Sequence, residues 1–282
     1  MKLLAVMLDC CEPRIVNELD LPNLKRWGVN TYESVPNTGP QMASLLFGIP
    51  LSEHGIYEYN VGINRLSVKK GKIIWEKIKS SIGIMNIPLT YPPPEKMNGW
   101  LVCGIDTPLG KPYTYPKRLW LELDALGYVI HPEKNRERGC YAMLPFDIRP
   151  DVMNAIWFKS VWDNAVKKRT KCFKYLCKRY PVDIGLIGYS VLDAVCHAFY
   201  PSRPDIVSYF YRLVDEKVGE LLNELRPEFV ILFSDHGAVP GRKEGRWSYG
   251  THGKTAYYST NIDTKITKIE DIHELIVRIG NE

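Results

Sequence analysis

Seven side chains of this chain could do chemistry together, three carboxylates, three imidazoles and one hydroxyl. Carboxylates and imidazoles suit Zn²⁺ and other borderline divalent ions, and one ion would not need so many ligands. Two ions about 3.5–4 Å apart could share them, one beside an attacking oxygen and one beside a leaving oxygen. The set therefore indicates a two-metal site for phosphoryl transfer. Its members are Asp9, Thr38, Asp193, His197, Asp235, His236 and His252.

The hydroxyl of this set stands at the start of an expected helix. Thr38 opens the stretch TGPQMASLLFG, and the free N–H groups of a helix N-terminus favour an anion. A hydroxyl activated by a bound metal is a recognised nucleophile. Taken alone, a plain capping threonine is the simpler interpretation. Asp9 directly follows the apolar stretch LAVML, and taken alone it is an ordinary turn or N-cap residue.

The other five residues fall in two later segments and a loop. Asp193 and His197 stand four apart in VLDAVCHAFY, so a helix would put both on one face, as ligands of one ion or as a surface ion pair. Asp235 and His236 follow the apolar stretch ILF, where polar groups without partners are costly, which favours function. The glycine-rich SYGTHGK predicts a loop around His252, which alone carries little signal.

The elements that must position these residues alternate along the chain. Apolar stretches predict buried strands at 2–8, 82–88, 183–189 and 228–234. Such alternation predicts an α/β fold with a largely parallel sheet covered on both faces, and ligands then bind at the carboxyl ends of the strands. One domain over 1–282 is expected, with an inserted cap at about 106–160. Helices are predicted at 22–27, 40–47, 73–80, 116–125, 154–180, 204–225 and 269–279.

Bulk properties place limits on the class of protein. A chain of 282 residues can bury a full core, and the net charge of +5 fits an anionic substrate. The chain contains no apolar run long enough to span a membrane, and its first residues are too soon polar for a signal peptide. Seven cysteines without a C-x-x-C pair indicate reduced thiols. We therefore expect a cytoplasmic protein.

Motif order and spacing resemble the alkaline phosphatase superfamily, and within it the type I phosphodiesterase/nucleotide pyrophosphatase family. The resemblance runs through most of the chain, while 109–182 match poorly. The segments that carry it are LAVMLD, LPNLKRWG (21–28), TGPQMASLLFGIPLSEHGI (38–56), NIPLTYPPPEKMNGWLVCGIDTP (86–108), VLDAVCHAFY (191–200), SDHG (234–237) and THG (251–253).

This resemblance implies a three-layer α/β/α sandwich and two divalent ions, zinc first, with manganese and iron as alternatives. Thr38 would be the nucleophile and pass through a phosphothreonine that water hydrolyses. Asn60, one position late for the family's phosphate-binding asparagine, would contact substrate, unless Tyr59 occupies that place. The first ion would be held by Asp9, Thr38, Asp235 and His236, and the second by Asp193, His197 and His252.

The expected activity is hydrolysis of small phosphate diesters, with nucleotide diesters or pyrophosphates among the candidate substrates. A phosphomonoesterase or phosphomutase of the same superfamily would share all seven residues. A metal-stabilised binding protein without catalysis is the alternative outside enzymes. The segment CCEPR (10–14) faintly resembles a sulfatase motif, but it lacks the residue between proline and arginine and does not occupy the nucleophile position.

Three further features have ordinary interpretations. The basic stretch KKRTKCFKYLCKR (167–179) is expected to be a solvated helix face, and contact with nucleic acid or a membrane surface is the alternative. His54 is expected to stabilise the turn after the nucleophile helix. His131 and His273 are expected at the surface. The oligomeric state and the meaning of the Cys10-Cys11 pair stay open.

Overall fold

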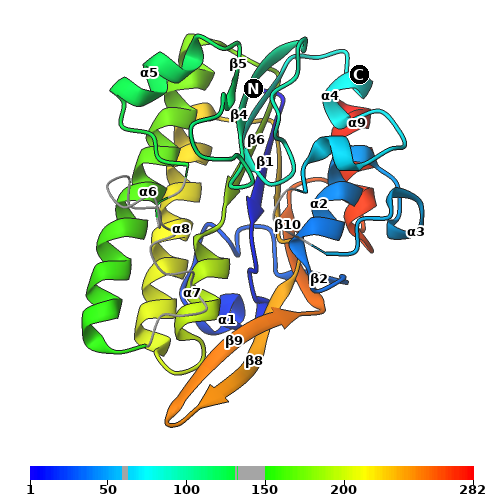
Figure 1. Ribbon diagram of the computed structural model, residues 1–282. Coiled ribbons are helices and arrows are strands. Elements are labelled where there is room, and N and C mark those ends of the chain that lie inside the picture. Colours follow the sequence, from blue (N-terminus) through cyan, green and yellow to red (C-terminus); the bar gives the residue numbers. More distant parts are fainter. Residues whose placement is uncertain (59–62, 131, 133–149) are drawn as a thin grey trace.

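An eight-stranded sheet forms the centre of the computed structural model, which describes residues 1–58, 63–130, 132 and 150–282 (Figure 1). Five neighbouring strands run parallel, and each of the other three is antiparallel to its inner neighbour. The mostly parallel α/β architecture expected from the sequence is confirmed. The strand order is β2 (Asn30–Glu33), β10 (Thr255–Thr260), β7 (Phe229–Phe233), β1 (Leu3–Leu8), β6 (Ile184–Tyr189), β3 (Ile82–Ile87), β4 (Gly99–Cys103) and β5 (Thr114–Tyr115).

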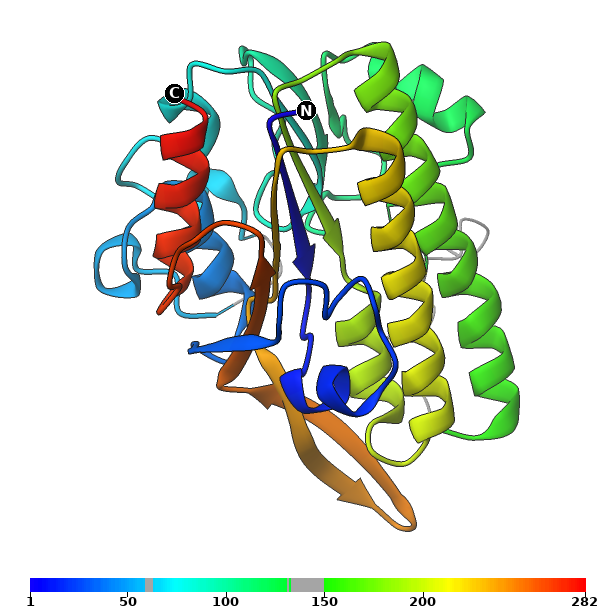
Figure 2. The same cartoon turned by 180° about the vertical axis from the view of Figure 1, so that it is seen from behind.

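Helices cover both faces of this sheet, and Figure 2 shows the two layers from behind. Successive side chains of a strand point to opposite faces, so β1 divides its residues between two cores. One layer holds α6 (Val152–Arg179), α7 (Val191–Phe199) and α8 (Pro204–Leu225), and the other holds α2 (Thr38–Phe47), α4 (Ile74–Lys77) and α9 (Ile269–Ile279). The even-numbered residues Leu4, Val6 and Leu8 belong to the core under α6 and α8, and the odd-numbered residues from Leu3 to Met7 belong to the core under α2 and α9.

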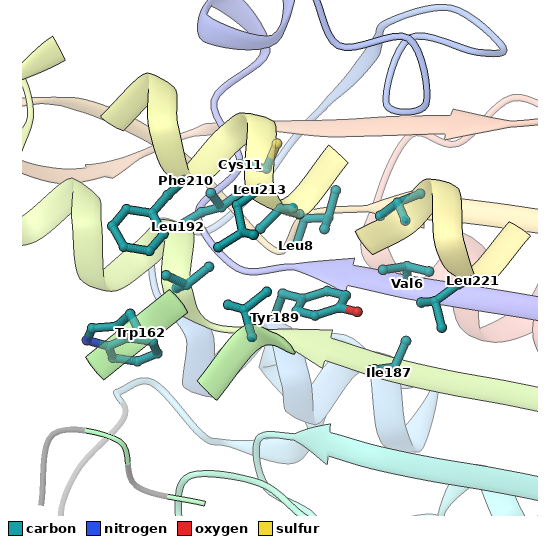
Figure 3. Packing of buried hydrophobic residues seen from close by; sticks show 14 of the residues in the cluster. Val6, Leu8, Cys11, Trp162, Ile187, Tyr189, Leu192, Phe210, Leu213 and Leu221 are labelled. Atoms are coloured by element: carbon teal, nitrogen blue, oxygen red, sulfur yellow. The ribbon is translucent and has the colours of Figure 1, made fainter. Parts of the chain in front are cut away.

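The first core is rich in aromatic rings. Figure 3 shows Tyr189 of β6 beside Leu8 and Val6, with Trp162 of α6 and Phe210 of α8 farther along the same layer. All five side chains are at most 2% exposed. Burying side chains of this size contributes about 1.5–3 kcal/mol each. The strand ends are therefore held rigidly by the packing behind them.

Several loops and short elements gather at the carboxyl edge of the sheet. Asp9 follows β1, α7 begins directly after β6, and Asp235 follows β7. The chain then forms a hairpin of β8 (Gly237–Glu244) and β9 (Trp247–Gly253), which extends beyond the sheet at the bottom of Figure 1. The short helix α1 (Pro13–Glu18) lies at the same edge. The sites expected at strand ends are thus brought to one edge.

Two local predictions are wrong. The expected helix at 22–27 is a series of turns, because its backbone hydrogen bonds join mainly residues three apart, as from Gly28 N to the Lys25 oxygen at 3.0 Å. The N–H groups of Asn23 and Leu24 donate to the Asp215 carboxylate of α8, at 2.9 and 2.8 Å. His252 lies in strand β9 rather than in a loop. The glycines that indicated a loop instead allow close packing, since a Cβ on Gly250 would lie 2.5 Å from Cys196 Sγ.

The described parts of the expected cap belong to the sheet and to the helical layer. β5 pairs with β4 at the sheet edge, and Glu122 of α5 (Leu119–Ala125) accepts hydrogen bonds from Tyr175 and Tyr180 of α6, at 2.7 and 2.6 Å. Most of 131–149 lies outside the described residues, so the cap stays a prediction. The remaining elements are α3 (Leu51–His54) and a 3₁₀ turn, η1 (Arg65–Ser67). Among the helices described, none is both long and apolar enough to cross a membrane.

Candidate metal centre

Two groups of potential metal ligands meet at the carboxyl edge and have one histidine in common. Asp9, Asp235 and His236 form the first group, and Asp193, His236 and His252 form the second. Within each group the ligand atoms lie within 4.8 Å of one another. The ligands come from the ends of β1 and β7, from α7 and from β9. Residues more than 200 positions apart in the sequence are therefore neighbours here.

The first group is buried and contains unpaired carboxylate oxygens. His236 Nε2 lies 3.3 Å from Asp235 Oδ2 and 3.7 Å from Asp9 Oδ1. Within the described part of the chain, neither of these two buried oxygens has a hydrogen-bond partner. Leaving a buried charged group unpaired costs at least about 1–3 kcal/mol. A bound divalent cation would satisfy both oxygens, so these residues fit the metal that the sequence predicts.

The electrostatics of the first group also favour a cation. Burial raises the pKa of Asp9 well above its usual range, and repulsion from Asp235 raises it further. Burial lowers the pKa of His236, which keeps its imidazole neutral. A neutral imidazole and two close carboxylates form a typical ligand set for Zn²⁺ or a similar ion.

The second group adds His197 from the same helix face as Asp193. The Nε2 atoms of His197 and His252 lie 3.2 and 3.1 Å from Asp193 Oδ1, and 2.8 Å from each other. Burial alone would raise the pKa of Asp193, but the two imidazoles hold it well below its usual range. The same carboxylate outweighs burial and raises the pKa of both His197 and His252. The helical spacing of Asp193 and His197 thus gives a convergent pair rather than a surface ion pair.

A backbone carbonyl faces the outer nitrogen of each of the three histidines. The Nδ1 atom of His236 lies 3.2 Å from the Gly237 oxygen. The corresponding distances are 3.3 Å from His197 to the Gly250 oxygen and 3.0 Å from His252 to the Pro36 oxygen. A carbonyl oxygen can only accept, so Nδ1 carries the proton. Each Nε2 is therefore the nitrogen that faces the centre and would bind an ion, after release of any proton that it shares with a facing carboxylate.

Thr38 lies beside the first group at the start of α2. Its Oγ1 is 3.1 Å from His236 Nε2. The helix is capped by the preceding residue, because Asn37 Oδ1 accepts a hydrogen bond of 3.0 Å from Gly39 N. Thr38 is therefore not the capping residue, and its hydroxyl is directed at the candidate centre. All seven predicted residues lie together, and their roles as ligands and nucleophile stay predictions.

Sequence reasoning missed a contact that joins α2 to the ligand set. Gln41 lies one turn after Thr38 and is 6% exposed. Its Nε2 donates to the backbone oxygen of Asp235, at 3.0 Å. A buried amide in the first turn of an apolar helix was the available signal, since such a group needs a partner. Asn60 and Tyr59, the predicted substrate contacts, lie outside the described residues.

The remaining histidines divide between a structural role and a correction. His54 is buried, and its ring contacts Ser44 Oγ and the Ile56 N–H, at 3.2 and 3.0 Å. The surface position predicted for His273 is wrong, because its side chain is 3% exposed. Its Nδ1 lies 2.7 Å from the Leu45 oxygen near the end of α2. His131 lies outside the described residues.

The cysteines and the basic stretch show ordinary packing. All the cysteines described are free and buried. Within 167–179, Lys174 pairs with Glu220 and Glu224 of α8, at 2.8 and 2.6 Å, while Phe173 is fully buried. These contacts favour the helix-face interpretation, and binding of nucleic acid or a membrane through this stretch stays the alternative prediction.

Comparison with known structures identifies the same fold in several phosphate- and phosphonate-processing enzymes. Phosphonoacetate hydrolase from Sinorhizobium meliloti 1021 matches with a TM-score of 0.52 and 17% identity, over 86% of this chain and 58% of that one. Murine ectonucleotide pyrophosphatase/phosphodiesterase 5 matches with a TM-score of 0.52 and 15% identity, over 86% and 59%. The alkaline phosphatase of the Antarctic bacterium TAB5 matches with a TM-score of 0.53 and 12% identity, over 100% and 99%. At such identities the likeness shows the fold.

The chain spans less than three fifths of the first two of these structures. No curated protein matches it. A family model, however, matches residues 3–250, which is most of the sequence. The chain belongs to the type I phosphodiesterase / nucleotide pyrophosphatase family.

Proposed function

We propose that this protein is a two-metal hydrolase of phosphate diesters with Thr38 as its nucleophile. One observation carries the proposal. The Thr38 hydroxyl lies 3.1 Å from a histidine that belongs to both candidate ligand groups. Family membership supports a phosphoester hydrolase, and the murine relative has been solved with AMP in an inactive form. Nucleotide diesters and pyrophosphates are therefore the first substrates to examine.

We assign the ligand sets as the family resemblance implies them. Asp9, Asp235 and His236, with the Thr38 oxygen, would hold one ion, and the remaining three predicted ligands would hold the other. When bound, the ions would lower the pKa of the hydroxyl and neutralise charge on the phosphoryl and leaving oxygens. Zinc is the first candidate, and manganese and iron accept the same ligand types. A cytoplasmic location stays a prediction.

The chain's own groups would carry the covalent chemistry. Thr38 Oγ1 gives its proton to water and attacks phosphorus, while the bond from phosphorus to the leaving oxygen breaks. The leaving oxygen takes a proton from water, and a phosphothreonine ester remains. A water molecule then attacks the phosphorus, the bond from phosphorus to Thr38 Oγ1 breaks, and Oγ1 takes back a proton, which releases the phosphate monoester and restores the hydroxyl. In the first turn of α2 the Gly39 N–H is bonded to Asn37 Oδ1 and Pro40 carries no N–H. The Thr38 N–H, at the N-terminus of the helix, would help to stabilise the negative phosphoryl oxygens.

Two alternatives share the same residues. A phosphomonoesterase or phosphomutase would use an identical centre and differ in the contacts to the rest of the substrate. A metal-stabilised binding protein would keep the ligands without turnover. The intact nucleophile favours an enzyme, because loss of catalysis would release Thr38 from selection.

Hydrolysis of bis-p-nitrophenyl phosphate and of p-nitrophenyl phosphate by purified protein tests the proposal. The protein is first stripped with a chelator and then supplied with Zn²⁺ or Mn²⁺. Metal-dependent turnover with preference for the diester is expected. Preference for the monoester would move the assignment to the phosphomonoesterase or phosphomutase branch. Metal binding without turnover of either ester would favour the binding protein.

A further inference from the structure

A further buried carboxylate, that of Glu12, lies beside the candidate centre and is not among the predicted ligands. Glu12 is 3% exposed, and its Oε2 accepts a hydrogen bond of 2.9 Å from the Ala238 N–H. Its Oε1 accepts from Arg14 Nε at 2.7 Å. Arg14 in turn donates from Nη2 to the Ala238 oxygen, at 3.1 Å. The two side chains therefore hold both backbone polar groups of one residue, Ala238, and we call this arrangement the Glu12–Arg14 clamp.

The clamped residue stands between the candidate ligands. Ala238 is the second residue after His236, and it pairs with His252 across the hairpin. Glu12 is the third residue after Asp9. The clamp therefore fixes the end of β1, the segment after β7 and the base of the hairpin against one another. These three segments supply four of the six predicted aspartate and histidine ligands.

Further contacts extend the clamp along the whole CCEPR segment. The Cys10 N–H donates to Asp235 Oδ1 and its Sγ donates to the Gly237 oxygen, both at 3.3 Å. The Ser234 hydroxyl donates to the Cys11 oxygen, also at 3.3 Å. Residues 10–14 thus lie alongside residues 234–238. A segment that the sequence associated with no role is the structural partner of the Asp235–His236 turn.

The atoms around the Glu12 carboxylate are closely packed. A Cβ on Gly237 would lie 2.7 Å from Glu12 Oε2 and 2.3 Å from the Thr255 oxygen. From the opposite side, the Glu12 backbone N–H donates to the Tyr211 hydroxyl of α8, at 2.8 Å. Tight packing on both sides turns a hydrogen bond into a positional constraint. Moving Glu12 would therefore move the ligand turn.

We propose that Glu12, supported by Arg14, is a positioning residue that sets Asp235, His236 and His252 in place against Asp9 before an ion binds. Its effect on turnover rests on the proposed function, whereas its effect on metal affinity does not. Partners of metal ligands typically contribute 10–100-fold in affinity. Capping of α1 uses only Oε1, which accepts from Arg14 N at 3.2 Å. The bond from Oε2 to Ala238 is thus additional to the cap.

The test is the affinity of the stripped protein for Zn²⁺, measured by competition with a chromogenic chelator. Glu12→Ala is expected to lower this affinity about 10–100-fold. Glu12→Gln keeps an acceptor for the Ala238 N–H but removes the negative charge that faces Arg14. Its zinc affinity should therefore lie between those of Glu12→Ala and the wild type. Glu18→Gln, at the exposed end of the same helix, is the matched control and should match the wild type. Turnover should show a lower kcat with little change in KM.

Zinc affinity within twofold of the wild type in a folded Glu12→Ala variant would overturn the proposal. If that variant does not fold, Arg14→Met takes its place, because it removes the donor to the Ala238 oxygen and the ion pair with Glu12 Oε1 but leaves the Glu12 bond to the Ala238 N–H. A loss of about 3–10-fold is expected there, and unchanged affinity would overturn the proposal equally. Wild-type protein that binds Zn²⁺ but hydrolyses neither ester would defeat the proposed function alone. Wild-type protein without zinc affinity would defeat both.

Discussion

At the scale of single residues, backbone carbonyls decide which nitrogen of each histidine can bind a metal. His197, His236 and His252 each turn Nδ1 to a carbonyl oxygen and Nε2 to the centre. Residue types and spacing predicted these histidines, but not the carbonyls, which come from loops and strands distant in the sequence. The buried oxygens of Asp9 and Asp235 complete a centre that is costly without a cation.

The first prediction concerns the free energy that the two buried carboxylates of Asp9 and Asp235 cost the metal-free fold. Asp9→Asn removes one of two close buried carboxylates, and its amide can donate to the unpaired Asp235 oxygen. The metal-free variant should therefore be more stable than the metal-free wild type, by roughly 1–3 kcal/mol, while the stabilisation by added Zn²⁺ should largely disappear. Thermal unfolding with chelator and with Zn²⁺ measures both. Asp20→Asn, at an exposed site, should change neither. A metal-free Asp9→Asn variant less stable than the wild type would contradict the account.

At the scale of elements, the end of α2 is held against α9 and α4. His273 of α9 contacts the Leu45 oxygen through Nδ1, and Lys77 Nζ lies 3.1 Å from its Nε2. The carbonyl can only accept and the ammonium can only donate, so this imidazole is held neutral. The same packing needs a glycine after α2, because Gly48 has φ +63 and a Cβ there would lie 2.2 Å from the His273 ring.

The second prediction follows from titration of His273. Burial lowers its pKa to about 4, from 6.5 for a free histidine. The unfolded chain therefore binds a proton that the folded chain refuses, and stability is lost as pH falls from about 6.5 toward 4. The full contribution is up to about 3 kcal/mol. In His273→Asn, whose amide can still donate to the Leu45 oxygen, the unfolding free energy should fall less steeply over this range. Denaturant unfolding of chelator-treated protein measures it, and equal slopes would refute the assignment.

The third prediction compares two glycines with left-handed backbones. Gly55 has φ +71 with open space around it, so Gly55→Ala should cost only the backbone strain, about 1–2 kcal/mol. Gly48→Ala should cost about 1–3 kcal/mol more, because the added methyl overlaps the His273 ring. Urea unfolding of the two variants side by side gives the difference. Equal losses at both positions would show that the ring moves aside freely.

Some elements follow from their local sequence, and others depend on contacts with residues distant in the sequence. The apolar strands 2–8 and 183–189 lie within about one residue of their predicted bounds, because a fully buried strand needs apolar residues throughout. The helix predicted at 22–27 is a series of turns, and its first N–H groups bind the Asp215 carboxylate, a partner 191 or 192 positions away that the local pattern does not contain. The hairpin that carries His252 contains glycine, proline and charged residues, and its pairing could not be seen locally.

At the scale of the whole molecule, one aromatic contact joins the helical layer to the candidate centre. Phe158 of α6 packs against Phe199 of α7 and Phe210 of α8, with ring centroids 5.0 and 5.4 Å apart. Because α7 carries Asp193 and His197, the position of these candidate ligands depends on packing outside the candidate centre. Sequence patterns predicted the layers and the ligand residues, but the packing between helices depends on side-chain shapes that no local pattern encodes.

The fourth prediction separates stability from positioning. Phe158→Ala should destabilise the fold by about 3–5 kcal/mol and also weaken Zn²⁺ binding, because Phe199 loses its support. Phe173→Ala is the matched control on the same helix, since Phe173 is fully buried and packs on Trp100 at the opposite end of the sheet. Its stability loss should be similar, with zinc affinity unchanged. Equal zinc affinities in the two folded variants would contradict the link through α7.

Turnover of bis-p-nitrophenyl phosphate by Thr38→Ala, with bound metal determined on the same sample, tests the central claim most directly. The account predicts wild-type metal content, a loss of at least ~10³-fold in kcat, and no phosphorylated protein after acid quench. Thr38→Ser should recover part of the activity, because it restores the hydroxyl. Turnover by Thr38→Ala within tenfold of the wild type would contradict the claim that this threonine is the nucleophile.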